Sequence, residues 1–270
     1  MERLNLANNI YEISNDKIIV KISEVAAEVY SFKKKDNDYN YVWSGDEKYW
    51  KGRNPILFPQ VSSTDNKTTL INGTYYPMGN HGFARDSIFK LKEIKKNELT
   101  LEISENENTI KQYPFSFNLI VNYKLDENKM IITYTIKNNS KDNMPFGFGL
   151  HPAFNCLDNY KNTKIIFNNL EDDFGNEIVI TKELFEKYPT VIINNPKSDK
   201  ATLISGDKSI SINYQGFKIF AVWSKGPFVC LEPWLNHTDK DHTIEMRDRK
   251  DYLELKPNEE YKISYSWEIG

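Results

Sequence analysis

The sequence predicts an all-β protein, a large antiparallel β-sandwich, and three observations lead to that prediction. Apolar and polar residues alternate with a period of two in many short segments, whereas no segment sustains the 3.6-residue period of an amphipathic helix. Clusters of Asn, Asp, Gly and Lys separate these segments, as turns do. Aromatic residues make up 13% of the 270 residues, which favours strands over helical bundles. Many closely spaced strands without intervening helices are typical of an antiparallel sandwich.

The strands can be placed along the chain from this alternation. It is clearest at residues 99–103 and 209–214. Further strands are expected at residues 17–22, 117–123, 130–136, 164–167, 177–180, 190–193, 217–223, 228–232, 252–255 and 261–269. One helical turn is expected at residues 181–187. Because neither a repeat nor a linker interrupts the pattern, we expect a single domain over residues 1–270.

Composition argues against several classes of partner. A net charge of −3 and a pI near 5.9 give no basic surface for nucleic acid. The two cysteines, Cys156 and Cys230, have no CxxC spacing, so neither a disulfide framework nor a metal knuckle is expected. The segment from Met1 to Asn5 has no apolar stretch like that of a signal peptide, and no run approaches the roughly 18 apolar residues of a membrane span. We therefore expect a cytoplasmic protein that binds neither nucleic acid nor a membrane.

Two of the four histidines stand in segments typical of a functional site. His81 lies in Gly-Asn-His-Gly-Phe-Ala-Arg and His151 in Gly-Leu-His-Pro-Ala-Phe, where a rigid, irregular backbone can aim a side chain into a cleft. His237 and His242 lie in a polar loop at residues 236–243, where an ordinary structural role is expected. No HxH or HExxH spacing is present, so no metal site is expected.

Glu232 is a carboxylate at the end of an apolar strand. Side chains alternate along a strand, so Glu232 shares one face with Phe228 and Cys230. Burial of an unpaired carboxylate is costly, so Glu232 is expected to be paired or functional. The residues leave both possibilities open, because Lys225 and Arg247 are basic residues close in sequence.

Several segments together resemble the aldose 1-epimerase family, specifically its LacX-like branch. They are RNPILFP at 53–59, HGFAR at 81–85, GLHPAF at 149–154, VWSK at 222–225 and VCLEPW at 229–234, in the family's order and roughly its spacing. The resemblance implies a galactose-mutarotase-like supersandwich with a cleft on one sheet. It also implies that Glu232 is the general base, that His151 is the general acid, and that His81 binds the substrate near its ring oxygen.

That resemblance implies a reaction that needs one base and one acid and no cofactor. Interconversion of the α- and β-anomers of an aldohexose removes a proton from O1 and delivers one to the ring oxygen O5. A small-molecule sugar is then the partner. Two alternatives stay open, a hexose-6-phosphate 1-epimerase and a carbohydrate-binding protein without turnover.

Further substrate-binding residues are expected around these groups. Arg53 and Arg85 have loop-type neighbours and could bind sugar hydroxyls or a phosphate, although either could be an ordinary surface arginine. Trp234 could offer an apolar face to a sugar ring or simply pack in the core. Many relatives have a V-G-R segment after the first motif, whereas here Val61 is followed by two serines, so that arginine is missing at Ser63. The family's substrate-binding aspartate cannot be assigned, although Asp172 and Asp173 lie in the expected interval.

Overall fold

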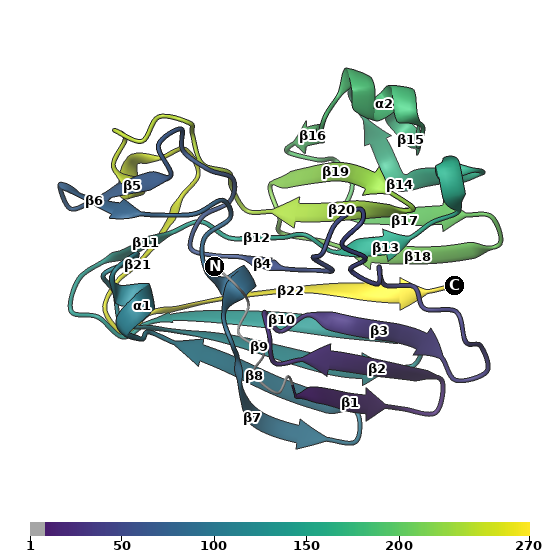
Figure 1. Ribbon diagram of the computed structural model, residues 1–270, viewed down its shortest axis with the longest axis horizontal. Coiled ribbons are helices and arrows are strands. Elements are labelled where there is room, and N and C mark those ends of the chain that lie inside the picture. Colours follow the sequence, from purple (N-terminus) through teal and green to yellow (C-terminus); the bar gives the residue numbers. More distant parts are fainter. Residues whose placement is uncertain (1–8) are drawn as a thin grey trace.

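The computed structural model describes residues 9–270 as two facing layers of antiparallel strands (Figure 1). The expectation about Met1 to Asn5 lies outside these residues. One layer is a single nine-stranded sheet built from β7 (Lys90–Lys95), β8 (Glu98–Ser104), β9 (Phe117–Asp126), β10 (Lys129–Asn138), β14 (Thr163–Glu171), β15 (Gly175–Val179), β17 (Lys200–Ser205), β18 (Lys208–Asn213) and β22 (Glu260–Ile269). The strand order is β15-β14-β17-β18-β22-β10-β9-β8-β7, so β22 lies at the centre of this sheet.

The second layer consists of two smaller sheets. One contains β1 (Ile10–Ser14), β2 (Ile18–Ser23) and β3 (Val29–Lys34). The other has the order β16-β19-β20-β12-β4, with β13 also paired to β20; its strands are β4 (Ile56–Leu57), β12 (Gly149–Leu150), β13 (Ala153–Asn155), β16 (Val191–Asn194), β19 (Ile219–Gly226) and β20 (Phe228–Trp234). Two ribbons complete the strands, β5 (Thr68–Ile71) with β6 (Thr74–Pro77) and β11 (Met144–Phe146) with β21 (Leu253–Leu255).

The hydrophobic core lies between the two layers. In β9 and β10 every second residue is buried, so one face of the large sheet supplies a continuous apolar surface. Trp267 of β22 joins this surface to the second layer, because its ring lies 6.3 Å from that of Phe32 and 5.0 Å from that of Phe154. Phe167 of β14 and Phe220 of β19 make a similar contact at 5.6 Å. The two layers therefore share one interior.

The expected all-β sandwich is confirmed, and a strand forms at each expected position with ends shifted by a few residues. Strands β1, β3, β7 and β17 were not expected, nor were the short strands that flank the histidine motifs. The expected helical turn is α2 (Lys182–Lys187), whose first turn is capped by Thr181 through a 3.1 Å hydrogen bond from the Leu184 N–H. The other helical elements are α1 (Glu107–Ile110) and the 3₁₀ turns η1 (Ala84–Asp86), η2 (Asp158–Tyr160) and η3 (Met246–Asp248).

Within residues 9–270, no helix is long and apolar enough to cross a membrane. The continuous nine-stranded sheet is consistent with a single domain, which stays a prediction.

Candidate active site

Strand β20 carries a carboxylate into the buried interior of the second layer. Every residue of β20 is buried, and Glu232 is only 1% exposed. The strand lies between β19 on one side and β12 and β13 on the other, and Glu232 is directly opposite Ala221 of β19. Strand alternation places Cys230, Glu232 and Trp234 on one face. This face forms the floor of the candidate site.

His151 lies between the short strands β12 and β13, in direct contact with Glu232. Its Nε2 is 3.3 Å from Oε2 of Glu232, and we refer to these two residues as the acid–base pair. The backbone beside His151 is fixed to the strand that carries Glu232, because the Leu231 N–H donates a 3.0 Å hydrogen bond to the Pro152 carbonyl. The imidazole also stacks on the Trp50 indole, with ring centroids 4.8 Å apart. The irregular Gly-Leu-His-Pro backbone therefore aims His151 at the carboxyl group.

His81 is held by a reciprocal pair of hydrogen bonds with Ser62. The His81 N–H donates to the Ser62 carbonyl at 2.9 Å, and the Ser62 N–H donates to Nδ1 of His81 at 3.0 Å. Both residues have left-handed backbone conformations, with φ of +66° and +67°. Because Nδ1 accepts a hydrogen bond, the ring proton is on Nε2. The local backbone thus presents His81 as a neutral hydrogen-bond donor, with its ring 5.8 Å from that of His151.

Burial controls the charge of all three groups. It raises the pKa of Glu232 well above its ordinary value, while the Arg85 guanidinium acts in the opposite direction. It lowers the pKa of His151 well below its ordinary value, and His81 and Arg85 add to that effect. Burial, reinforced by Arg85, lowers the pKa of His81 to about 3. Both shifts in the acid–base pair favour the uncharged forms, so the resting pair holds a single proton, shared across the contact.

These groups open onto a cleft of about 380 Å³, a size suited to a small ligand. It is lined by Tyr49, Trp50, Ser62, Asn80, His81, Arg85, His151, Thr190, Trp223, Lys225, Glu232 and Trp234. A wider depression of about 760 Å³ lies beside β14, β15 and α2, but no histidine lines it. The smaller cleft is therefore the better candidate, because it holds a buried histidine in contact with a buried carboxyl group.

The chain is similar to known proteins over most of its length. Residues 9–186, about two thirds of the chain, match the family model for aldose 1-epimerase. The chain belongs to the aldose 1-epimerase family. It is 26% identical to the plasmid-encoded protein LacX of Lactococcus lactis subsp. lactis, over 94% of this chain and 97% of LacX.

Solved structures place the fold in the same family. A galactose mutarotase-like protein from Lactobacillus casei superimposes with a TM-score of 0.90 at 27% identity, covering 97% of this chain and 100% of that one. A galactose mutarotase related enzyme from Lactobacillus acidophilus gives a TM-score of 0.89 at 27% identity, covering 97% of each chain. The galactose mutarotase-like fold is thus confirmed, and the protein is an isomerase of the aldose 1-epimerase family with mutarotase-type function.

Five of the six site residues expected from the sequence line the cleft of this epimerase family member, namely His81, Arg85, His151, Glu232 and Trp234. Trp234 is 4% exposed and packs with Leu57, Val61, Ile219 and Ala221, so its ring face belongs to the core. Its Nε1 has no hydrogen-bond partner in the described part of the chain. The structure therefore places Trp234 in core packing, one of the two roles that the sequence left open.

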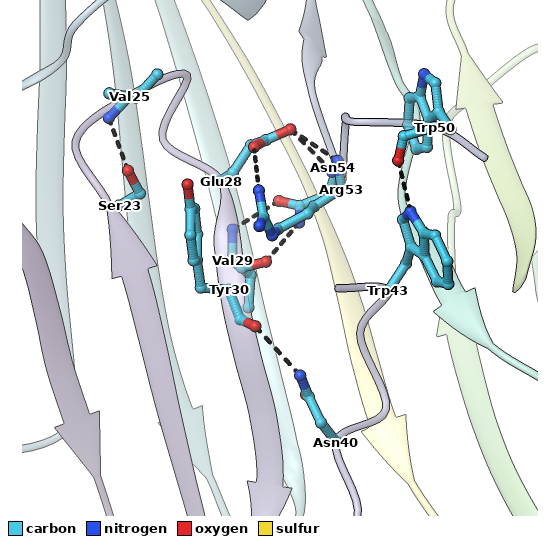
Figure 2. A network of polar contacts seen from close by, with 10 residues as sticks. All are labelled: Ser23, Val25, Glu28, Val29, Tyr30, Asn40, Trp43, Trp50, Arg53 and Asn54. Atoms are coloured by element: carbon cyan, nitrogen blue, oxygen red, sulfur yellow. Dashed lines mark hydrogen bonds and ion pairs between the residues drawn. The ribbon is translucent and has the colours of Figure 1, made fainter. Parts of the chain in front are cut away.

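Arg53 does not line the cleft, which departs from the expectation that it binds substrate. Figure 2 shows its guanidinium between Glu28 and the ring of Tyr30. The guanidinium nitrogen is 3.7 Å from a Glu28 oxygen, and its carbon is 3.8 Å from the Tyr30 ring centroid. Glu28 is 1% exposed and also accepts a 2.9 Å hydrogen bond from the Arg53 N–H. A buried carboxylate is costly without a cation beside it, so the Arg53 side chain serves as the ion-pair partner of Glu28.

The Arg53 segment nevertheless supports the site indirectly. The Arg53 carbonyl accepts a 2.8 Å hydrogen bond from the Ala153 N–H, two residues from His151. Three residues before Arg53, the Trp50 carbonyl accepts a 2.8 Å hydrogen bond from the Trp43 indole, which Figure 2 also shows. These contacts fix the loop that holds the Trp50 ring against His151.

Sequence reasoning missed the aromatic walls of the cleft. Trp50 and Trp223 both contact His151, the latter edge-on with centroids 5.6 Å apart. Trp223 could have been found, because it is paired across the strands with Cys230 and so lies on the same face as Glu232. Trp50 comes from a loop, and no local pattern separates it from a core tryptophan.

The remaining sequence candidates lie elsewhere. His237 is exposed, and Nε2 of His242 is 3.0 Å from the Asn66 side chain, away from the cleft. No aspartate lines the cleft within residues 9–270, and Asp172 instead pairs with Lys197 at the protein surface. The family's substrate-binding aspartate therefore has no counterpart among the described cleft residues.

Proposed function

We propose that the protein interconverts the α- and β-anomers of an aldohexose by acid–base ring opening. The observation that carries this proposal is the 3.3 Å contact between the His151 imidazole and the Glu232 carboxyl group at the floor of the cleft. Membership of the aldose 1-epimerase family supports it. Ring opening needs two proton transfers at oxygens bonded to the same carbon, C1, so a base and an acid in contact can reach both.

The proton balance of the reaction fits a pair that holds one proton. In the reactive form Glu232 is a carboxylate and His151 an imidazolium. Glu232 removes the O1 proton, the O1 electrons form the carbonyl, the C1–O5 bond breaks, and O5 takes its proton from His151. The open-chain aldehyde then stands beside a carboxylic acid and a neutral imidazole. After rotation about C1–C2, the same transfers run in reverse and close the ring on the other face.

Burial shifts the pKa of both members of the acid–base pair in the direction that proton transfer requires. A Glu near its ordinary pKa of about 4.3 is a weak base, and the raised pKa of Glu232 makes its carboxylate a stronger one. The lowered pKa of His151 makes its imidazolium a stronger acid. Both changes favour ring opening, and no step requires a cofactor.

The other cleft residues orient the sugar in this proposal. Neutral His81 donates its Nε2–H near the ring oxygen, while Arg85 is a further donor to sugar oxygens. Trp50 and Trp223 supply the aromatic faces on which the apolar side of a sugar ring can pack.

Anomer equilibration of freshly dissolved α-galactose and α-glucose, followed by polarimetry or NMR, tests the proposal. Glu232→Gln and His151→Asn should each lower the catalysed rate roughly 10²- to 10⁴-fold, the usual contribution of a general acid or base. His237→Gln is the matched control, since His237 is exposed and outside the cleft. An unchanged rate in either cleft variant would refute the assignment. Sugar binding by the wild-type protein without any rate above background would instead establish the non-catalytic carbohydrate-binding alternative.

A second candidate substrate, a hexose 6-phosphate, is favoured by one observation. Two cationic side chains, Arg85 and Lys225, line the cleft, whereas Glu232 is the one carboxylate among its described lining residues. The free sugar remains our first choice, because basic residues are sparse in the surrounding motifs. A higher kcat/KM for glucose 6-phosphate than for glucose, with that preference lost in Lys225→Gln, would reverse this order.

A further inference from the structure

We propose that His151, Cys230 and Glu232 form a binding site for a thiophilic divalent cation such as Zn²⁺, and that the bound cation blocks the acid–base pair. The metal binding is independent of the function proposed above, whereas the block rests on it. Sequence reasoning gave no metal site because the three ligands do not form a known spacing motif. Cys230 and Glu232 are on one strand, while His151 comes from the segment between β12 and β13.

The three side chains converge closely enough to share one ion. One potential ligand atom from each lies within 4.8 Å of the other two. Two ligands about 2.1 Å from a tetrahedral zinc ion are about 3.4 Å apart, and His151 Nε2 and Glu232 Oε2 are already at 3.3 Å. A thiolate bond to zinc is longer, at about 2.3 Å, so the thiol needs to approach by only up to about 1 Å.

The donor set is typical of a site with one open position. Nitrogen, sulfur and carboxylate oxygen are the ligands that zinc prefers, and three protein ligands leave the fourth for water or another small ligand. Here that position faces the cleft, since His151 and Glu232 line it while Cys230 lies behind them. An ion held there would occupy the lone pairs of the acid–base pair and exclude the sugar oxygens.

Two unpartnered atoms show that the cluster is not closed on itself. Among residues 9–270, neither His151 Nδ1 nor Glu232 Oε1 has a hydrogen-bond partner, although both side chains are at least nine-tenths buried. These are the ring nitrogen and the carboxyl oxygen that take no part in the 3.3 Å contact, so no further hydrogen bond has to break when Nε2 and Oε2 turn to an ion.

The charges of the ligands match a dication. On binding, the Cys230 thiol and the acid–base pair each release one proton to solvent, so the ion is held by a thiolate, a carboxylate and a neutral imidazole, and the two anions neutralise it. Arg85 opposes binding because its cation lines the same cleft, whereas His81 is uncharged and does not. The net charge of the occupied ligand set is therefore zero, which makes its burial tolerable.

Titration with Co²⁺, a spectroscopic substitute for Zn²⁺, tests the site without any assay of activity. The metal-free, reduced protein is titrated while absorbance is recorded for the thiolate-to-cobalt charge-transfer band. We expect this band in the wild type and in Cys156→Ala, which removes the other cysteine, and we expect it to be lost in Cys230→Ala. Added Zn²⁺ should displace Co²⁺ and abolish the band. Glu232→Gln should weaken Co²⁺ binding at least tenfold while the folded circular dichroism spectrum is kept.

Inhibition by Zn²⁺ is then measured relative to each variant's own metal-free rate. The inhibition constant should rise at least tenfold in Cys230→Ala and stay within twofold in Cys156→Ala. Absence of the band in the wild type, or its persistence in folded Cys230→Ala, overturns the proposed site. A band without any anomerisation in the metal-free wild type would keep the metal site and refute the proposed function instead.

Discussion

Replacement of Gly52 by alanine should displace the indole that stacks on His151. A Cβ at Gly52 would lie 2.5, 2.8 and 2.9 Å from three atoms of the Trp50 ring, all below the 3.4 Å at which ordinary van der Waals contact begins. The ring must therefore retreat by about 1 Å, because a bulky indole cannot fold out of the way as a flexible chain could. Its contacts with His151, at 4.8 Å, and with Phe228, at 5.7 Å between centroids, would then loosen.

Two magnitudes follow from this displacement. Overpacking of this kind costs about 1–3 kcal/mol of unfolding free energy, which urea denaturation can measure. A misplacement of about 1 Å at a site can cost up to roughly 100-fold in rate, so we expect kcat/KM for anomerisation to fall about 10- to 100-fold. Gly79→Ala is the matched control, because a Cβ at Gly79 has nothing within 4 Å and its φ is not positive. If Gly52→Ala matches Gly79→Ala in both measurements, Trp50 does not position His151.

Three further predictions concern charge. A plot of log(kcat/KM) against pH should be bell-shaped, with limbs of slope about +1 and −1, because the acid–base pair is active only when it holds one proton. A plot that rises or falls throughout would contradict a shared proton. His81 takes up a proton at about pH 3 in the folded protein but near 6.5 when unfolded, so the unfolding free energy should fall by about 1.4 kcal/mol per unit as pH decreases through that window. Urea titrations of His81→Gln should lack this part of the slope, and an identical pH dependence would exclude a neutral, half-buried His81. Arg53→Ala should lower the free energy of unfolding by about 3 kcal/mol, because it leaves Glu28 buried without its cation. Arg85→Ala should mainly raise KM, because Arg85 lines the cleft. The reverse result would mean that Arg53 binds the substrate.

Most of the fold could be predicted from the sequence because its strands have one buried face. In strands such as β9 and β10, buried and more exposed residues alternate strictly, so the sequence itself shows the pattern. Strand β7 was missed because all six of its residues are exposed, so no apolar alternation marks it. The two-residue strands β4 and β12 are too short to carry any period.

The site residues could be predicted where the chemistry requires a particular residue type. They could not be predicted where tertiary packing decides the direction of a side chain. The two histidines in rigid motifs were singled out from local sequence, whereas Glu232 stayed open between an ion pair and a functional role until the family resemblance assigned it one. The structure brings all three into one cleft. Arg53 has the same kind of loop neighbours as Arg85, yet it is directed elsewhere by Glu28, which lies 25 residues away in sequence. A tertiary contact of this kind leaves no trace in the residues around either partner.

The central position of β22 has a consequence for how the chain must be made. β18 and β10 are both synthesised before β22, yet each pairs with it in the finished sheet. Until β22 has been synthesised, β10 and β18 therefore each lack the strand that completes their backbone hydrogen bonds. Such edges can capture strands of other nascent chains, so expression conditions that slow translation or raise chain concentration should favour aggregation over the native sandwich.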